Sequence, residues 1–157
     1  LLKPGPLTDA EFAIMKTHSL IGGNTLRDAD YEAGQNSFLA MGRDIAYYHH
    51  ERWDGKGYPN GLKGNEIPFA ARIVTLADVY DALTSKRPYK EAFSHERARE
   101  IVLAGADKQF DPDVVEAFVR REKEFIKVRK TFQNTEETSL LQQLSEAVDR
   151  LEANPVG

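Results

Sequence analysis

The sequence contains no cysteine, so it offers neither a disulfide framework nor thiolate chemistry, as suits a reducing cytoplasm. It also lacks long apolar runs, because charged residues make up 29% of the chain and interrupt them, which excludes a membrane span. Basic residues (21) are fewer than acidic ones (25), and the net charge of −4 disfavours non-specific binding to nucleic acid or anionic lipid. We therefore expect a cytoplasmic globular protein with no nucleic-acid or membrane partner, in which any phosphate site is local.

The start of the chain lacks a methionine, a basic n-region and an apolar h-region, so it resembles neither a signal peptide nor a natural N-terminus. A chain of 157 residues is long enough for one domain with its own core. No segment has a convincing strand period, and no internal repeat or low-complexity run appears. We expect an all-α domain cut from a longer protein.

Capping signals and periodicity predict the first two helices. Thr8 and Glu11 have the spacing of a capping box, which predicts a helix start near Asp9. The inner stripe of this helix is expected to contain Ile14, Met15, Ile21 and Thr25. His18 falls within that stripe and is expected to face inward. A polar stretch at 27–37 is followed by a second amphipathic pattern. It predicts a helix whose inner face contains Phe38, Met41, Ile45 and His49.

Glycine and proline mark the rest of the chain. The segment 54–64 holds four glycines and a proline, which predicts a loop. A third helix is expected from Pro68 to Leu83, apolar on both sides and therefore buried. Ser94 caps a fourth helix, and a fifth begins at residues 111–112. The tail, 131–157, is expected to form an amphipathic helix whose apolar stripe packs on the body rather than on a second copy; its members are Leu141, Leu144, Val148 and Leu151.

Potential metal ligands lie on three of these helices: His18, His49 and Asp78, with His50 adjacent. Burying such groups is costly unless they are paired or bind metal. Neighbouring histidines on a helix project about 100° apart, which suits two adjacent ions rather than one. Imidazole and carboxylate without sulfur favour iron, manganese, zinc or nickel. A buried salt bridge from Asp78 to Arg72 or to a histidine is an equally good reading of the residue types.

Two further groups have competing interpretations. Asp78 and Asp81 lie three residues apart and could act as a carboxylate pair, but we favour Asp81 as an acceptor that orients a ligand histidine. Lys86, Arg87 and Lys90 follow the third helix, where cations favour the helix dipole without any ligand. Alternatively, Arg87 and Lys90 hold a phosphate beside the metal.

A set of motifs runs through residues 1–120 in a fixed order. The main ones are HHERWDGKGYPNGL at 49–62, IP at 67–68, ARI at 71–73, ADVYDALT at 77–84 and RPYK at 87–90. Others are KPGPLT at 3–8, MKTH at 15–18 and FDP at 110–112. Together they closely resemble the HD-GYP domain of bacterial signalling phosphodiesterases.

The resemblance implies an HD-type helical bundle that hydrolyses cyclic di-GMP to pGpG or GMP with two or three divalent ions, iron or manganese being most common. By the same resemblance, the metal ligands are expected to be His18, His49, His50 and Asp78, with Asp78 at the catalytic centre. The substrate-binding residues are expected to be Gly57, Tyr58, Pro59, Arg87 and Lys90.

One part of the family pattern has no counterpart here. A His-Asp pair and a lysine precede the 3–8 motif in the family, whereas only Leu1 and Leu2 precede it in this sequence, and no His-Asp dipeptide occurs elsewhere. We therefore expect 1–130 to be the larger C-terminal part of an HD-GYP domain that is active in its parent and inactive alone. The upstream segment would have been cut away, lie outside this sequence, or come from a partner chain; we favour the first two.

The identity of any further partner stays open at this point. The resemblance implies that a receiver or sensory domain could be attached to this one. The apolar stripe of the tail could also pair with a second copy in a homodimer. The rival to an enzyme is a non-catalytic module that binds a cyclic dinucleotide or a protein through the glycine-rich loop, Arg87 and Lys90. That module would bind its ligand in EDTA and would lose affinity with added salt.

Overall fold

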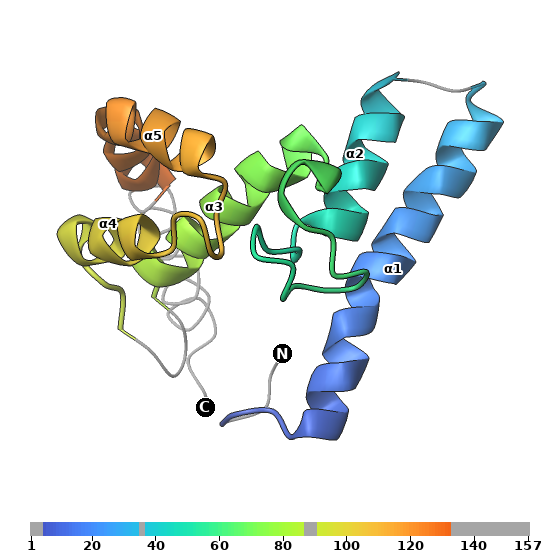
Figure 1. Ribbon diagram of the computed structural model, residues 1–157, viewed down its shortest axis with the longest axis horizontal. Helices are drawn as coiled ribbons and strands as arrows, with labels where there is room; N and C mark the ends of the chain where they lie inside the picture. Colours follow the sequence, from blue (N-terminus) through green and yellow to red (C-terminus); the bar gives the residue numbers. More distant parts are fainter. Residues whose placement is uncertain (1–4, 35–36, 87–90, 133–157) are drawn as a thin grey trace, which may run out of the picture. The chain divides into compact units, whose positions relative to one another are not determined.

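The computed structural model describes residues 5–34, 37–86 and 91–132 of the chain (Figure 1). The chain divides into two compact units, Leu1–Val119 and Arg120–Gly157. Throughout the described residues the regular elements are helices, with a single isolated bridge between Ala106 and Phe110. None of these helices is long and apolar enough to cross a membrane. The predicted all-α class is confirmed, while most of the expected tail helix lies outside the described residues.

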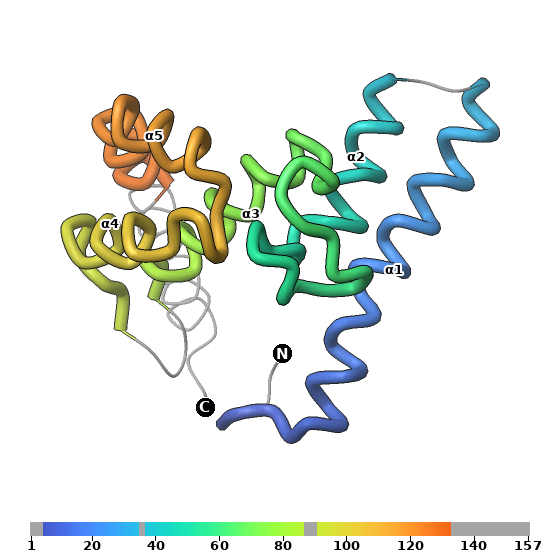
Figure 2. Tube along the Cα trace, in the orientation of Figure 1, coloured from blue at the N-terminus to red at the C-terminus, as the bar shows by residue number. Residues whose placement is uncertain are grey.

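In the described residues of the first unit there are five α-helices and one short 3-10 helix. In chain order they are α1 (Asp9–Glu32), α2 (Ser37–Tyr48), η1 (Gly64–Glu66), α3 (Phe69–Thr84), α4 (His95–Ala104) and α5 (Pro112–Arg120). Figure 2 shows α1 and α2 side by side, with a long loop leading from α2 into α3. Helix α3 in turn contacts α2 and α4. In the second unit, residues 122–132 are helical.

The start of α1 agrees with the predicted capping box. The backbone N–H of Thr8 donates to Glu11 Oε2 at 2.7 Å, and the N–H of Glu11 donates to Thr8 Oγ1 at 3.3 Å. These two bonds satisfy free amides of the first turn. The helix then continues to Glu32, through the first part of the polar stretch at 27–37. Its polarity reflects a mostly solvent-exposed helix end rather than a break.

The predicted inner stripes of the first two helices are wrong. Ile14 and Ile21 in α1 are 71% and 62% exposed, and Phe38 and Met41 in α2 are 72% and 47% exposed. His18 is exposed as well. Helical periodicity identified stripes on both helices, but it does not identify which face of each helix meets the other.

Small residues form the interface between α1 and α2. Ser19 and Gly23 are buried there, and a Cβ atom at Gly23 would lie 2.2 Å from the ring of Tyr47. Glycine therefore permits the close approach of the two helices. Asp30, also buried, lies 3.6 Å from the guanidinium of Arg43. Because the buried residues of α1 at this interface are small or charged, apolar periodicity could not reveal it.

The apolar core lies where α3, α4 and α5 meet. Its most buried members are Ile67, Ala71, Leu76, Tyr80, Ala98, Val102, Phe110, Val114, Val115 and Phe118. The rings of Tyr80 and Phe118 lie 5.5 Å apart, joining α3 to α5. The expectation that α3 is buried on both sides is wrong, because Ile73 is 43% exposed and Asp78 is exposed. Thr75, Asp78 and Val79 of α3 line the cavity described next.

Candidate metal centre

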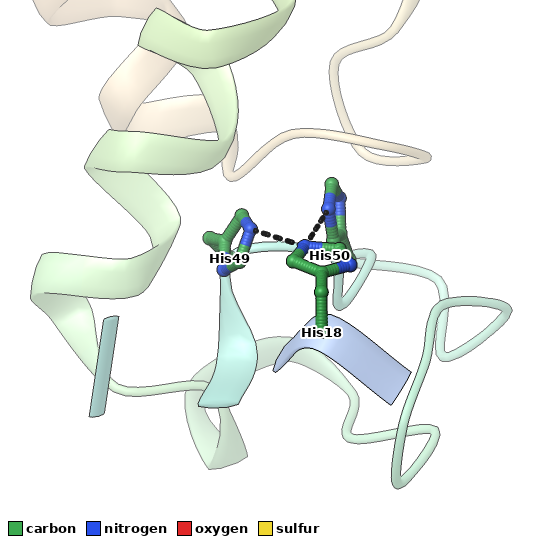
Figure 3. A group of neighbouring side chains, drawn as sticks. All are labelled: His18, His49 and His50. Atoms are coloured by element: carbon green, nitrogen blue, oxygen red, sulfur yellow. Dashed lines mark hydrogen bonds between the residues drawn. The ribbon is translucent and has the colours of Figure 1, made fainter. Parts of the chain in front are cut away.

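Three histidines from two separate segments converge on one point (Figure 3). His18 comes from α1, whereas His49 and His50 are the two residues after the end of α2. The Nε2 atom of His18 lies 3.4 Å from Nε2 of His49 and 3.1 Å from Nε2 of His50. The structure therefore brings together three of the four predicted ligands, each offering one nitrogen within 4.8 Å of the others.

The predicted separation of His49 and His50 is wrong. It assumed that both lie on a helix, but α2 ends at Tyr48 and the chain turns there. Their ring centroids are consequently only 4.0 Å apart. Both rings therefore reach the same point beside His18.

Backbone carbonyls determine which nitrogens of this cluster carry protons. His18 Nδ1 lies 2.6 Å from the carbonyl oxygen of Met15, and His49 Nδ1 lies 2.9 Å from that of Ile45. A carbonyl only accepts, so each Nδ1 is the donor, and in the neutral form of each ring the lone pair of Nε2 is directed into the cluster. Two such lone pairs 3.4 Å apart repel each other unless a proton or a metal ion lies between them. This donor set fits a divalent metal ion, and carbonyl-held histidines are typical of metal sites.

His50 is held in the form that binds metal. Its pKa is lowered from 6.5 to about 4, by burial first and then by the neighbouring His49 and His18, while the carboxylate of Asp78 acts in the opposite direction. The imidazole is therefore neutral near pH 7. Neutral imidazole is the ligating form, so His50 does not have to lose a positive charge before a metal binds.

Asp78 lies on α3 and lines the same cavity, of about 350 Å³, as His49 and His50. It is exposed and does not belong to the three-histidine cluster, so its role as a ligand stays a prediction. Its charge nevertheless acts on Tyr58, whose pKa is raised by burial first and by Asp78 second. The alternative of a buried salt bridge between Asp78 and Arg72 is not observed. The guanidinium of Arg72 instead pairs with Asp111 at 2.7 Å.

Asp81 is exposed on α3 and accepts a hydrogen bond from Ser85 Oγ at 3.1 Å. The Nδ1 atoms of His18 and His49 bind backbone carbonyls instead of this carboxylate. The role of Asp81 in orienting a ligand histidine therefore stays a prediction. Arg87 and Lys90 lie outside the described residues, and their role in binding substrate is likewise a prediction.

The glycine-rich loop folds back against the histidines. A Cβ atom at Gly57 would lie 2.4 Å from the backbone nitrogen of Arg52 and 2.5 Å from Glu51 Cα, so only glycine fits. Tyr58 follows; its N–H donates to the carbonyl of His50 at 3.2 Å, and its ring stacks on His50 at 4.7 Å. The Tyr58–Pro59 peptide bond is cis. The predicted signature loop thus forms one wall of the cavity.

Glu51 has a role that the sequence analysis missed. Its side chain is 1% exposed. Oε1 accepts from the N–H groups of Asn60 and Gly61 at 2.7 and 3.1 Å, and Oε2 accepts from that of Leu62 at 3.0 Å. Successive loop amides make a favourable anion site, so this carboxylate holds the glycine-rich loop. An acidic residue shortly before a glycine-rich segment was the available signal.

Comparisons with known proteins relate the chain to one family. The model of the HD domain family matches residues 1–114. The chain is 51% identical over 134 residues to a cyclic di-GMP phosphodiesterase of Vibrio cholerae, covering 85% of this chain and 27% of that protein. It is 49% identical over 120 residues to a cyclic di-GMP phosphodiesterase response regulator of Xanthomonas campestris, covering 76% and 30%. It is 40% identical over 129 residues to 3'3'-cGAMP-specific phosphodiesterase 2 of Vibrio cholerae, covering 82% and 24%. The chain thus spans less than a third of the length of each of these relatives.

Proposed function

Because the chain belongs to the HD domain family, as its resemblance to HD-GYP domains predicted, we propose that it is the catalytic part of a metal-dependent phosphodiesterase. Its proposed substrate is cyclic di-GMP, which is hydrolysed to pGpG or GMP. The observation that carries the proposal is the convergence of the Nε2 atoms of His18, His49 and His50. Cyclic di-GMP is preferred to cGAMP because the relatives at 51% and 49% identity bear its name, against 40% for the cGAMP enzyme.

HD domains bind divalent metal ions, and the donor set supports such a site here. The residues that would hold the ions are His18, His49, His50 and, as an oxygen ligand at the catalytic centre, Asp78. Bound divalent ions activate water as a nucleophile and neutralise charge that develops on phosphate oxygens. Nitrogen and oxygen ligands without sulfur are compatible with iron or manganese, which we propose in a site of two or three ions.

The residues of the chain itself orient the site and bind the substrate. Thr75 Oγ1 donates to the carbonyl of His49 at 2.8 Å, which holds the backbone of that ligand against α3. Tyr58 stacks on one face of His50 and limits the movement of its ring. We assign substrate binding to the loop Gly57, Tyr58 and Pro59, together with Arg87 and Lys90. Asp81 is proposed to support a ligand histidine when metal is bound.

The partners beyond the substrate are part of the same proposal. An attached receiver or sensory domain is supported by the greater length of the relatives and by the printed name of the response regulator among them. A homodimer through the tail at 131–157 is the alternative use of that segment. The absence of cysteine supports a cytoplasmic location.

The test is hydrolysis of cyclic di-GMP by the full-length protein, purified without chelators and supplied with manganese or iron. We expect His49→Ala to abolish turnover and to reduce the metal content, because it removes one of three converging nitrogens. His95→Gln is the matched control, since His95 bonds to Tyr80 in the core and lies outside the cavity.

Three results would contradict the proposal. Unchanged turnover in His49→Ala would refute the metal assignment. Faster hydrolysis of 3'3'-cGAMP than of cyclic di-GMP would reassign the substrate. Binding of cyclic di-GMP that survives EDTA, without any hydrolysis when metal is present, would favour the non-catalytic module.

A further inference from the structure

Lys16 extends from α1 to the wall of the cavity that contains His49 and His50. Its Nζ atom lies 5.1 Å from the ring centroid of Phe12 and 5.7 Å from that of Tyr58. The two rings meet edge to face, with centroids 6.3 Å apart and an angle of 82°. Cation–π attraction therefore holds the ammonium group at this wall, between α1 and the signature loop.

The charge of Lys16 is not neutralised by an ion pair within the described part of the chain. This distinguishes it from Arg52, which also lines the cavity but pairs with Asp54 at 2.9 Å. Glu51 is no partner for Lys16 either, because its oxygens accept three loop amides. The ammonium group is half-buried and accessible from the cavity.

A cyclic dinucleotide requires more than one cationic contact. It carries two phosphodiester groups, each with one negative charge, and only the group being hydrolysed can lie at the metal centre. The second phosphate needs another partner, because a phosphate that loses water without a compensating charge is destabilised. Lys16 supplies a positive charge at the same cavity, and the 46% exposed ring of Phe12 supplies an aromatic surface of the kind on which bases pack.

We propose that Lys16 binds the phosphate of the cyclic dinucleotide that is not being hydrolysed, and that Phe12 and Tyr58 position its ammonium group for this contact. The assignment rests on the proposed function and adds to it a binding residue on α1. A metal centre and a separate cation would then hold the two phosphates of one substrate. Lysine is suited to the role, since its ammonium is a compact charge with three donors.

The experiment measures the affinity of the metal-loaded, full-length protein for a phosphorothioate analogue of cyclic di-GMP that resists hydrolysis. We expect Lys16→Met to weaken binding about tenfold and to reduce its dependence on ionic strength, because one charge-assisted contact is lost. Lys16→Arg should retain most of the affinity. Lys123→Met is the matched control: it removes the same charge from an exposed lysine that does not line the cavity.

Kinetics on cyclic di-GMP supply a second readout. A residue that binds substrate before and during the reaction raises KM more than it lowers kcat when it is removed. Equal affinities of Lys16→Met and Lys123→Met, or a loss confined to kcat, would overturn the assignment of Lys16 while hydrolysis by the wild type upholds the proposed function. A wild type that neither binds nor hydrolyses cyclic di-GMP would overturn both.

Discussion

Glu51 allows a quantitative test of how the cavity wall is held. In Glu51→Gln, the amide oxygen can still accept from Asn60 and Gly61, but the amide NH₂ then faces the N–H of Leu62, donor against donor. A hydrogen bond to a charged group contributes about 1.5–3 kcal/mol, and a neutral one about 0.5–1.5 kcal/mol. The variant loses one charge-assisted bond and weakens two, while it gains from no longer burying a charge. We expect a net loss of about 2 kcal/mol in the free energy of unfolding.

The matched control is Glu66→Gln. Glu66 also accepts a backbone N–H through its carboxylate, from Lys63 at 2.9 Å, but it is exposed to solvent. Water replaces such a bond easily, so this variant should lose less than about 0.5 kcal/mol. Urea unfolding of both variants gives the free energies. Hydrogen exchange should accelerate in Glu51→Gln alone, most for the amide of Leu62, which loses its buried acceptor, and less for the amides of Asn60 and Gly61, which keep a weaker one.

The reasoning would be refuted by equal unfolding free energies for Glu51→Gln and Glu66→Gln. It would also be refuted if the amides of residues 60–62 exchanged as slowly in Glu51→Gln as in the wild type. Either outcome would mean that the loop is held by its other contacts, chiefly the packing of Gly57 and Tyr58 against residues 50–52.

Two other predictions concern the helix interface and the titration of the site. Gly23→Ala should destabilise the protein by about 1–3 kcal/mol, because the added Cβ would overlap the ring of Tyr47. Gly22→Ala should instead stabilise it by about 0.5–1 kcal/mol, since its Cβ would meet Ala46 at an ordinary 3.6 Å. Thermal unfolding of both variants checks this, and equal shifts in their unfolding temperatures would contradict it. In the metal-free protein, burial first and the neighbouring His49 and His18 second lower the pKa of His50 from 6.5 to about 4. Between these pH values the unfolded chain therefore binds a proton there that the folded chain does not. The stability that neutral His50 contributes should therefore be complete above about pH 6.5 and be lost as the pH falls to about 4. Urea unfolding at a series of pH values measures this loss. If the unfolding free energy of His50→Gln changed with pH as steeply as that of the wild type, the prediction would be contradicted.

Local sequence chemistry determined where several helices begin, and the sequence motifs identified three histidines that share a site. Thr8 and Glu11 specify the start of α1 because their side chains satisfy amides within one turn, and Ser94 does the same for α4 through the N–H of Arg97. The spacing of Pro68 and the following apolar residues placed α3 correctly. The order of the histidine motifs indicated a shared site, and His18, His49 and His50 do converge.

Tertiary structure decided which faces these helices bury and how the site is held. The α1–α2 interface depends on the fit of Gly23 against Tyr47, a property of two surfaces that periodicity along one helix does not contain. Lys16 meets Tyr58, and Glu51 meets the amides of residues 60–62, only because the loop folds back on itself and onto α1. Propensity and capping act over one helical turn, whereas these contacts join residues whose distance is set by the packing of the whole unit.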